Sequence, residues 1–463
     1  MSFDETIAAV STPPGEGGIG IVRISGAEAY SIGKRIFVPR RKWPAGDYPR
    51  SHHLYYGHIF SEKGELIDEV LQSFMKAPHT YTREDSVEIN CHSGIFTLRQ
   101  ILERVLSEGA RLARPGEFTE RAFLRGRIDL SQAESVLRII RARSEEGART
   151  AADNLKGRLS QNIREMRSAM LSLLARVEAQ LDFPDDLEDE AAVGEEIKKE
   201  LLRFRGELER LAEGAERGQT MQEGLLSAIV GKPNAGKSSL LNALLREQRA
   251  IVHEAPGTTR DLLEGYLNIS GYPLRLVDTA GIHATEDPVE QAGIKKAAGA
   301  AARARLMILV LDGSTAWSED DDAAAALIGP GQLAVIVINK IDLRQQLSRT
   351  MVSERFSDYP VVETAAIKGE GIGCLEETIG GLLDRRLGTA GAESPVMTSI
   401  RQARVVEETR DSLERALGVL SGQPLELVAL ELREAWRKLG EITGETASEE
   451  LIDQIFSEFC IGK

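Results

Sequence analysis

The sequence is poor in cysteine and in aromatic side chains, and it contains no long apolar run. Its three cysteines, Cys91, Cys374 and Cys460, are widely separated and show no metal-ligand spacing. This pattern argues against a disulfide framework or a zinc site and is typical of a reducing compartment. The longest uncharged apolar runs, such as LMILVL and QLAVIVI, are too short to span a bilayer and predict buried strands.

Positive charge is also scarce, because the net charge is −15 over 463 residues. A nucleic-acid-binding protein is usually basic. The first 126 residues are balanced in charge, whereas each later region has an acidic excess. We therefore expect any contact with nucleic acid to use local basic patches. The beginning, MSFDETIAAV, resembles neither a signal peptide nor an Arg-rich transit peptide, so we expect a cytoplasmic protein.

The pattern of the sequence changes three times along the chain. Residues 1–120 combine β-type runs such as GIGIVRIS and SVEINCHS with Gly and Pro clusters, which predicts a mixed α/β domain. Residues 121–222 and 386–463 are mainly helical in pattern. Between them, residues 223–385 alternate apolar runs with helical segments, which predicts a parallel sheet. A nucleotide-type domain is thus expected to be inserted into a helical domain.

Apolar residues recur at spacings of three and four before Pro184, which predicts one face of a long helix packed in a bundle. They are Leu155, Leu159, Ile163, Met166, Met170, Leu174, Val177 and Leu181. A second helix is expected around 193–217. The acidic run DFPDDLEDE between them predicts a solvated connector, since its spacing matches no metal-ligand pattern.

The strongest motif is GKPNAGKS, Gly231–Ser238, which satisfies the phosphate-loop pattern G-x-x-x-x-G-K-[ST]. Its glycines let backbone N–H groups surround phosphates at the positive end of a helix. Lys237 would then reach the β- and γ-phosphates, and Ser238 would coordinate Mg²⁺. The alternative is a Gly-rich turn without a ligand, which is disfavoured because further elements follow in the right order.

Two further motifs close later strands. In DTAG, residues 278–281, Asp278 would face the magnesium site and Gly281 would place an N–H near the γ-phosphate. In NKID, residues 339–342, Asn339 and Asp342 carry the donor and acceptor groups that can read guanine. The set resembles the translation-factor-like GTPases, in which GTTR at 257–260 would supply Thr259 as the switch threonine on Mg²⁺.

Three departures from the usual GTPase pattern affect the expected mechanism. The base loop reads Ala365-Ala366-Ile367 where Ser-Ala-Lys is usual, so one contact to the base is weakened. Ile282 stands where a Ras-like enzyme has the Gln that orients the attacking water. The sequence also shows no arginine finger, so the positive charge and the water-orienting group must come from elsewhere.

Over nearly its whole length the chain resembles the MnmE (TrmE) family, the GTPases that modify the tRNA wobble uridine. The resemblance rests on GKPNAGKSS, APGTTRD, DTAGI, EDPVEQAGI, GGIGIVRISG, ARPGEFTERAFLRGRIDLSQAE and the terminal CIGK. It implies a multidomain α/β and all-α chain. An N-terminal α+β folate-binding-like domain would span 1–120, and a discontinuous helical domain would span 121–222 and 386–463. A Ras-like P-loop GTPase domain, a parallel-rich sheet flanked by helices, would occupy 223–385.

The resemblance also implies the two missing parts of the GTPase site. K⁺ would take the place of an arginine finger, with ligands from Asn234, His253, Ala255 and Thr258, and Glu290 would orient the water. The alternatives are a turn role for Asn234 and a merely solvated Glu290. The expected GTP-binding residues are Asn234, Ala235, Gly236, Lys237, Ser238, Ser239, His253, Glu254, Ala255, Pro256, Gly257, Thr258, Thr259, Asp278, Thr279, Ala280, Gly281, Asn339, Lys340, Asp342, Ala365 and Ala366.

For the first domain the resemblance implies homodimerisation and a folate site with Arg23, Glu88 and Arg127. For Arg23 and Glu88 the residues alone favour ordinary charges on a strand face. Implied with the folate are one-carbon transfer from 5-formyl- or 5,10-methylene-tetrahydrofolate to C5 of the uridine, and the flavin-dependent partner MnmG (GidA). The chain itself has no FAD or NAD fingerprint, which is consistent with a flavin on the partner.

Two other classes of function stay open from the residues. One is a ribosome-assembly type GTPase switch that only binds RNA, but no convincing G-x-x-G clamp occurs. The other is a scaffold whose GTPase domain gates a helical bundle.

The tail FCIGK raises the question of Cys460. Gly462 and Lys463 do not fit a prenylation box, which leaves a reactive thiol or a packing residue. The neighbours Phe459 and Ile461 predict partial burial of Cys460, which would raise the pKa of its thiol. The resemblance places this end beside the folate site, where Lys463 would help to hold the cofactor or the uridine.

Overall fold

The computed structural model describes residues 5–13, 15–43, 48–182, 190–247, 265–277, 303–388, 397, 399–420 and 424–463. The chain forms two compact units. Unit 1 consists of Met1–Leu137, Ile163–Arg167 and Trp436–Lys463, and unit 2 of Arg138–Asn162 and Ser168–Ala435. These units cut the chain differently from the four predicted segments, so the predicted domain limits stay a prediction. Among the described residues, no helix combines the length and the apolar character needed to cross a membrane.

Unit 1 contains a seven-stranded sheet in the order β3-β4-β5-β6-β2-β1-β7, antiparallel except where β1 meets β7. Its strands are β1 Ile7–Val10, β2 Gly20–Ser25, β3 Phe37–Pro39, β4 His53–Phe60, β5 Leu66–Met75, β6 Ser86–Cys91 and β7 Arg111–Leu112. The runs GIGIVRIS and SVEINCHS form strands β2 and β6, as expected. The structure pairs these two strands and sets Arg23 opposite Glu88.

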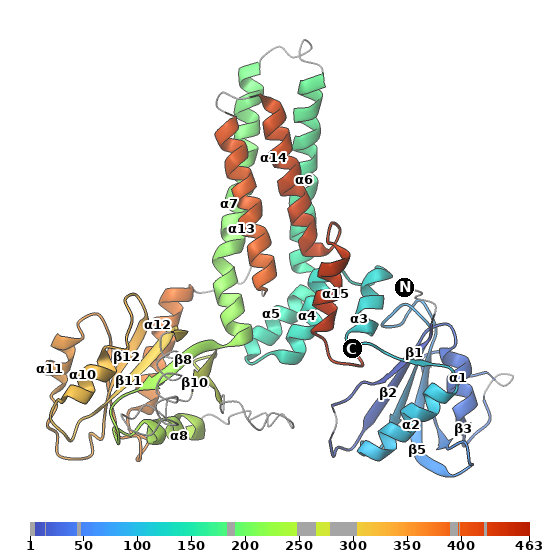
Figure 1. The fold of residues 1–463 in the computed structure, drawn as a ribbon, viewed down its shortest axis with the longest axis horizontal. Coiled ribbons are helices and arrows are strands. Elements are labelled where there is room, and N and C mark those ends of the chain that lie inside the picture. Colours follow the sequence, from blue (N-terminus) through green and yellow to red (C-terminus); the bar gives the residue numbers. More distant parts are fainter. Residues whose placement is uncertain are drawn as a thin grey trace, which may run out of the picture. The chain divides into compact units, whose positions relative to one another are not determined.

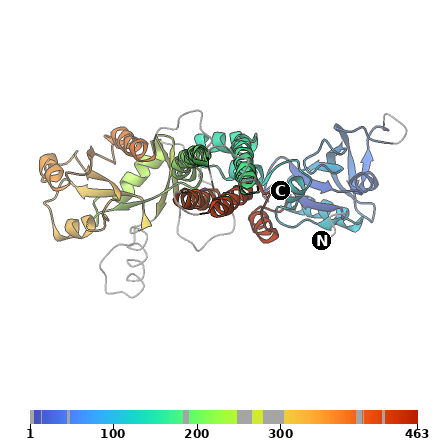
Figure 2. The same ribbon diagram turned by 90° about the horizontal axis from the view of Figure 1, so that it is seen from above.

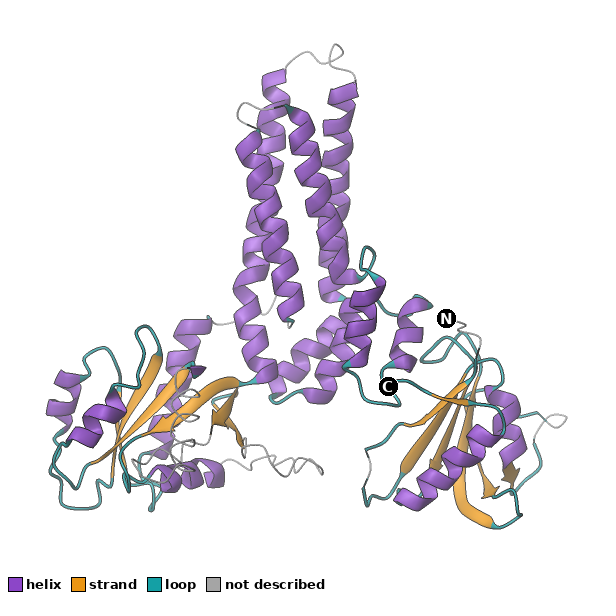
Figure 3. Ribbon diagram, viewed as in Figure 1, coloured by secondary structure: helices purple, strands orange, loops and turns teal. Residues whose placement is uncertain are grey.

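Helices cover both faces of this sheet. On one face lie α1 (Ala29–Ile36) and α2 (Ile95–Ser107), two of the purple helices beside this sheet in Figure 3. They bury Ile32 and Ile101 against the strands. On the other face, Phe118 of α3 (Glu117–Leu124) packs on Ile7 and Ala9. Helix α15 (Glu449–Ser457) adds Phe456 to the α3 side, so the end of the chain is part of the core of unit 1.

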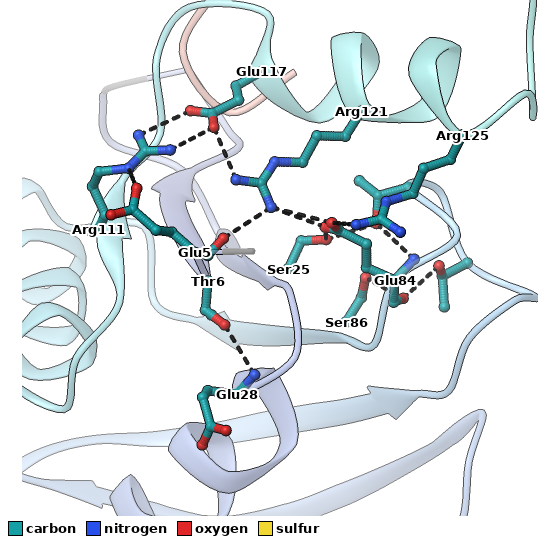
Figure 4. A network of polar contacts seen from close by, with 12 residues as sticks. Glu5, Thr6, Ser25, Glu28, Glu84, Ser86, Arg111, Glu117, Arg121 and Arg125 are labelled. Atoms are coloured by element: carbon teal, nitrogen blue, oxygen red, sulfur yellow. Dashed lines mark hydrogen bonds and ion pairs between the residues drawn. The ribbon is translucent and has the colours of Figure 1, made fainter. Parts of the chain in front are cut away.

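A buried polar network fastens α3 to the sheet (Figure 4). The guanidinium of Arg121 donates to Glu117 at 2.9 Å and to both oxygens of Glu84 at 3.2 Å. All three side chains are at most 5% exposed. Arg111 closes the other side of Glu117 at 2.6 Å. The network therefore fixes the orientation of α3, whose first turn contacts the C-terminal residues Cys460 and Lys463 through backbone hydrogen bonds.

Unit 2 contains a six-stranded sheet in the order β13-β12-β11-β8-β10-β9, parallel except for β9. Its strands are β8 Leu225–Val230, β9 Gly265–Ile269, β10 Tyr272–Val277, β11 Leu306–Asp312, β12 Leu333–Asn339 and β13 Val361–Thr364. The predicted apolar runs LMILVL and QLAVIVI form β11 and β12. They are buried on both faces, under α8 (Lys237–Glu247), α10 (Glu319–Ala325), α11 (Arg349–Arg355) and α12 (Ile372–Leu387).

The helical regions contain α4 Leu130–Arg141, α5 Glu145–Leu155, α6 Arg158–Asp182, α7 Glu190–Glu223, α13 Ile400–Val419 and α14 Leu425–Thr443. In unit 2, α7 and α13 pack along each other (Figures 1 and 2). The predicted apolar face is buried from Leu159 to Val177. Leu155, however, ends the separate helix α5, because Gly157, at φ 93°, interrupts the helix before α6. The second helix is longer than expected.

Candidate functional site

The phosphate loop connects β8 to α8 at the centre of the sheet of unit 2. Gly231 has φ 153°, and a Cβ there would lie 2.2 Å from the carbonyl oxygen of Val310. Gly236 has φ 99°, and a Cβ there would lie 2.1 Å from Nδ2 of Asn339. Both glycines are therefore required by backbone shape and by close approach to neighbouring strands.

Lys237 lies at the start of α8 with its ammonium turned into the loop. Its Nζ donates to the carbonyls of Gly231 at 2.8 Å and Lys232 at 2.9 Å. Burial lowers the pKa of Lys237. The loop thus holds a partly desolvated positive charge beside the N-terminus of a helix, which is an arrangement suited to phosphates.

Asn339 joins the phosphate loop to the base loop. Its Nδ2 donates to the carbonyl of Ala235 at 3.0 Å, and its Oδ1 accepts from Thr364 Oγ1 and Ala366 N, each at 3.1 Å. The side chain is 1% exposed. Among the described residues the second amide hydrogen of Asn339 has no partner, which leaves it for a ligand. The motif predicted a base-reading residue, and the structure adds this linking role.

A cavity of about 340 Å³ lies between α8 and the base loop, near the remaining base-side residues Lys340 and Asp342. Lys340 is anchored by Asp312 at 2.6 Å, and Asp342 lies 3.4 Å from Lys368. Burial would raise the pKa of Asp312, but hydrogen bonds from Lys340 and Ser314 outweigh it and lower that pKa. The cavity is lined by Ser239, Asn242 and Ala243 of α8, by Ala366, Ile367, Lys368 and Gly369 of the base loop, and by Ile372.

Several predicted site residues lie outside the described part of the chain. They are His253, Glu254, Ala255, Pro256, Gly257, Thr258, Thr259, Asp278, Thr279, Ala280, Gly281 and Glu290, together with Ile282. Of the expected Mg²⁺ and K⁺ ligands, only Ser238 and Asn234 are described. Asn234 has φ 59° and an exposed side chain.

One contact of the loop escaped sequence reasoning. Lys232 forms an ion pair with Asp321 at 2.8 Å across 89 residues of chain. The Ser-x-x-Asp pattern from Ser318 to Asp321 indicates a helix start, and the structure has a capping box there. Nothing in the sequence, however, relates that helix start to the phosphate loop.

The expected folate residues gather in unit 1 around Tyr81. Arg23 donates to Glu88 at 2.9 Å and to the carbonyl of Gly462 at 3.4 Å. The guanidinium groups of Arg23 and Arg127 lie 5.6 Å and 4.5 Å from the Tyr81 ring centroid. Burial, and then the charge of Arg23, lower the pKa of Lys463. The structure thus brings together side chains that are far apart in the sequence.

The tail is fixed by its backbone. Gly462, at φ 92°, packs so closely that a Cβ would lie 2.2 Å from the carbonyl of Val10, and Ser11 Oγ donates to the Gly462 carbonyl at 3.1 Å. Phe459 is buried, but Cys460 is exposed, so the predicted partial burial of that thiol is wrong. The chain leaves α15 with Phe459 turned into the core and the next side chain turned outward.

The chain is similar to known proteins over its whole length. A family model described as the MnmE helical domain matches residues 130–460, and one described as the GTP-binding protein TrmE N-terminus matches residues 6–127. The chain is 45% identical to a tRNA modification GTPase MnmE of Geobacillus kaustophilus, over 100% of each chain. It is 46% identical to one of Symbiobacterium thermophilum, over 99% of this chain and 100% of that one. The solved G domain of the T. maritima FeoB iron transporter is 27% identical, with a TM-score of 0.26, and covers 33% of this chain and 94% of that chain.

Proposed function

Because the chain belongs to the MnmE family of tRNA modification GTPases, we propose that it couples K⁺-stimulated GTP hydrolysis to modification of the tRNA wobble uridine. The modification would place an aminomethyl or carboxymethylaminomethyl group at C5, using a tetrahydrofolate one-carbon unit and a flavin-dependent partner, MnmG. The GTPase role is supported by two residues. Lys237 in the phosphate loop is held by two loop carbonyls, and Asn339 at the end of β12 donates to the carbonyl of Ala235 in that loop.

Mg²⁺ would be held by Ser238 together with Thr259 and the phosphates, with Asp278 facing the site. The Ser238 hydroxyl lies exposed in the first turn of α8, and it is a hard oxygen ligand that suits Mg²⁺. The ion would neutralise the charge that develops on the phosphates. Glu290 would orient the attacking water, since Ile282 cannot.

K⁺ would bind to the Asn234 amide oxygen and to oxygens of His253, Ala255 and Thr258. Asn234 fits this role, because its side chain is exposed and has no hydrogen-bond partner among the described residues. An amide oxygen is a suitable ligand for a hard cation. The cation would supply positive charge where a Ras-like enzyme receives an arginine.

GTP hydrolysis by the full chain should be at least about tenfold faster in K⁺ than in Na⁺ at equal ionic strength, because a fitted cation stabilises transition-state charge. Asn234→Ala should remove most of this difference while leaving the Na⁺ rate unchanged. Release of inorganic phosphate in matched chloride salts measures both effects. Equal rates of the unmodified chain in the two salts would contradict the K⁺ proposal.

The folate would bind around Tyr81, with Arg23, Glu88, Arg127 and Lys463 as its polar partners. The Nε of Arg127 is buried and has no hydrogen-bond partner among the described residues, so the site contains a donor that a ligand could satisfy. The guanidinium groups suit the folate glutamate, and a carboxylate suits the pterin ring. Cys460, being exposed beside this region, keeps its proposed role as a modification thiol.

Arg127→Ala should weaken binding of 5-formyltetrahydrofolate about ten- to a hundredfold, since a charge-assisted contact is lost. Isothermal titration of the full chain measures it. Arg99→Ala is the control, because the Arg99 side chain is 72% exposed on α2 and, among the described residues, its ion pair is with Glu103. GTP hydrolysis should be unchanged in both variants. Failure of the unmodified chain to bind the folate would favour the RNA-binding switch instead.

We propose that the protein forms a homodimer through its N-terminal domain and that MnmG and tRNA are its partners in the cytoplasm. The dimer is supported by Leu54, Tyr56 and Leu71, which stay 38–62% exposed on neighbouring strands β4 and β5. Removal of the gene tests the whole proposal. The modified wobble uridine should disappear from total tRNA, and its persistence would count against the function.

A further inference from the structure

The phosphate loop is anchored to the start of α10 by a buried ion pair. Lys232, the residue after Gly231, donates from its Nζ to Asp321 Oδ2 and to Thr315 Oγ1, each at 2.8 Å. The Lys232 side chain is 10% exposed and the Asp321 side chain 0%. An ionised carboxylate so deeply buried needs a partner of opposite charge.

All the described donors to Asp321 reach a single oxygen. Besides Lys232, the backbone N and the Oγ of Ser318 donate to Oδ2 at 3.0 and 2.8 Å. Oδ1 is buried and has no hydrogen-bond partner among the described residues. The other described donors to Asp321 are neutral, so Lys232 supplies the positive charge that faces this buried carboxylate.

The same residue also contacts the phosphate-binding lysine. The Lys232 carbonyl accepts from Lys237 Nζ at 2.9 Å, and the neighbouring Gly231 carbonyl accepts at 2.8 Å. The position of the Lys232 backbone therefore sets where the Lys237 ammonium lies. The β11 strand limits movement of the loop at Gly231, where it already makes close contact.

We propose that Asp321 is a positioning residue for GTP hydrolysis, acting through Lys232 on Lys237. The start of α10, fixed by its capping box, gives the loop a rigid reference outside the nucleotide site. With the Lys232–Asp321 ion pair intact, the carbonyls of Gly231 and Lys232 hold the Lys237 ammonium where it can contact the phosphates. Without it, the loop keeps its glycines and its helix but loses the tether that fixes residue 232.

Asp321→Asn tests this in the full chain, because the amide oxygen can still cap Ser318 while the charge that holds Lys232 is gone. We expect kcat at saturating GTP to fall about tenfold, as a misplaced catalytic group costs that much or more. Asp322→Asn is the matched control. Asp322 is the next residue of the same helix, and its ion pair with Arg355 is exposed and does not touch the loop. It should keep the original kcat.

Lys232→Met should lower kcat about as far as Asp321→Asn, since either change removes the ion pair. The double variant Lys232→Met/Asp321→Asn should melt at a higher temperature than Lys232→Met alone, yet stay as slow as Asp321→Asn. Rates are normalised to the fraction of chains that bind a fluorescent GTP analogue, which separates lost folding from lost positioning. The proposal is overturned if Asp321→Asn and Asp322→Asn have the same normalised kcat, or if the double variant recovers the original rate.

Discussion

Replacing Lys237 with alanine should lower kcat/KM for GTP about a thousandfold or more, because one lost charge stabiliser already costs a hundred- to a thousandfold. The geometry explains the size of the effect. The Lys237 ammonium is held by two carbonyls inside the loop, and burial lowers its pKa, so the bound phosphates would meet a charge that water screens weakly. Initial rates of phosphate release at GTP concentrations well below KM measure kcat/KM for both chains.

The matched control for Lys237→Ala is Lys156→Ala. Lys156 follows α5, its side chain is 78% exposed, and its ion pair within the described part of the chain is with Asp153. This variant should hydrolyse GTP like the unmodified chain. Circular dichroism should show the same melting transition for both variants, because Lys237 fills no hydrophobic core. If Lys237→Ala kept a rate within tenfold of the original, the assignment of this loop as the phosphate site would be wrong.

The sequence predicted those features of unit 2 that depend on local pattern. Apolar runs such as LMILVLD and LAVIVIN became β11 and β12, because a strand covered on both faces has no polar alternation. The phosphate loop was predictable because its glycines and Lys237 must stand at fixed spacing. In each case the residues close together in the sequence determine the local structure.

Contacts between distant segments could not be predicted in this way. Asn339 links the phosphate loop to the base loop only because β12 lies near β8 in the sheet, and the pair Lys232–Asp321 depends on where α10 begins. Cys460 was misjudged for a related reason. Its apolar neighbours in sequence do not determine its burial. Where the chain leaves a helix and becomes extended, the side chains of consecutive residues point to opposite sides.

The polar network of unit 1 gave no signal in the sequence either. Glu117 and Arg121 are four residues apart on α3, which usually indicates an exposed helix pair worth a few tenths of a kcal/mol. The structure instead buries both beside Glu84, as Figure 4 shows. The ion pair is therefore buried here, and we expect its loss to cost much more stability than the loss of an exposed pair at the same spacing.

Arg121→Met should lower the free energy of unfolding of unit 1 by roughly 3 kcal/mol, because Glu117 and Glu84 lose the buried cation that they share. Each keeps one further arginine, Arg111 and Arg125, which limits the loss. Arg99→Met, on the exposed face of α2, should change it by less than about 1 kcal/mol. Urea unfolding of the full chain, followed by the protection of unit 1 backbone amides from hydrogen exchange, measures both. Equal stability of the two variants would show that the network is not energetically coupled.

The pH dependence gives a second and sharper measurement of the same network. Burial would raise the pKa of Glu117, but hydrogen bonds from Arg111, the Arg114 backbone and Arg121 outweigh it and lower that pKa to about 2. A lowered pKa in the folded state means that Glu117 stabilises the fold above its ordinary value of 4.5 and that this stabilisation is lost as the pH falls toward 2. Arg121→Met removes one of the hydrogen bonds that lower this pKa, so the pKa of Glu117 is higher in the variant than in the unmodified chain. The difference in stability between the two chains should therefore be largest near neutral pH and shrink below pH 4.5, as protonation removes the charge that Arg121 balances. A difference that stayed constant down to pH 3 would assign the effect of Arg121 to packing instead of charge.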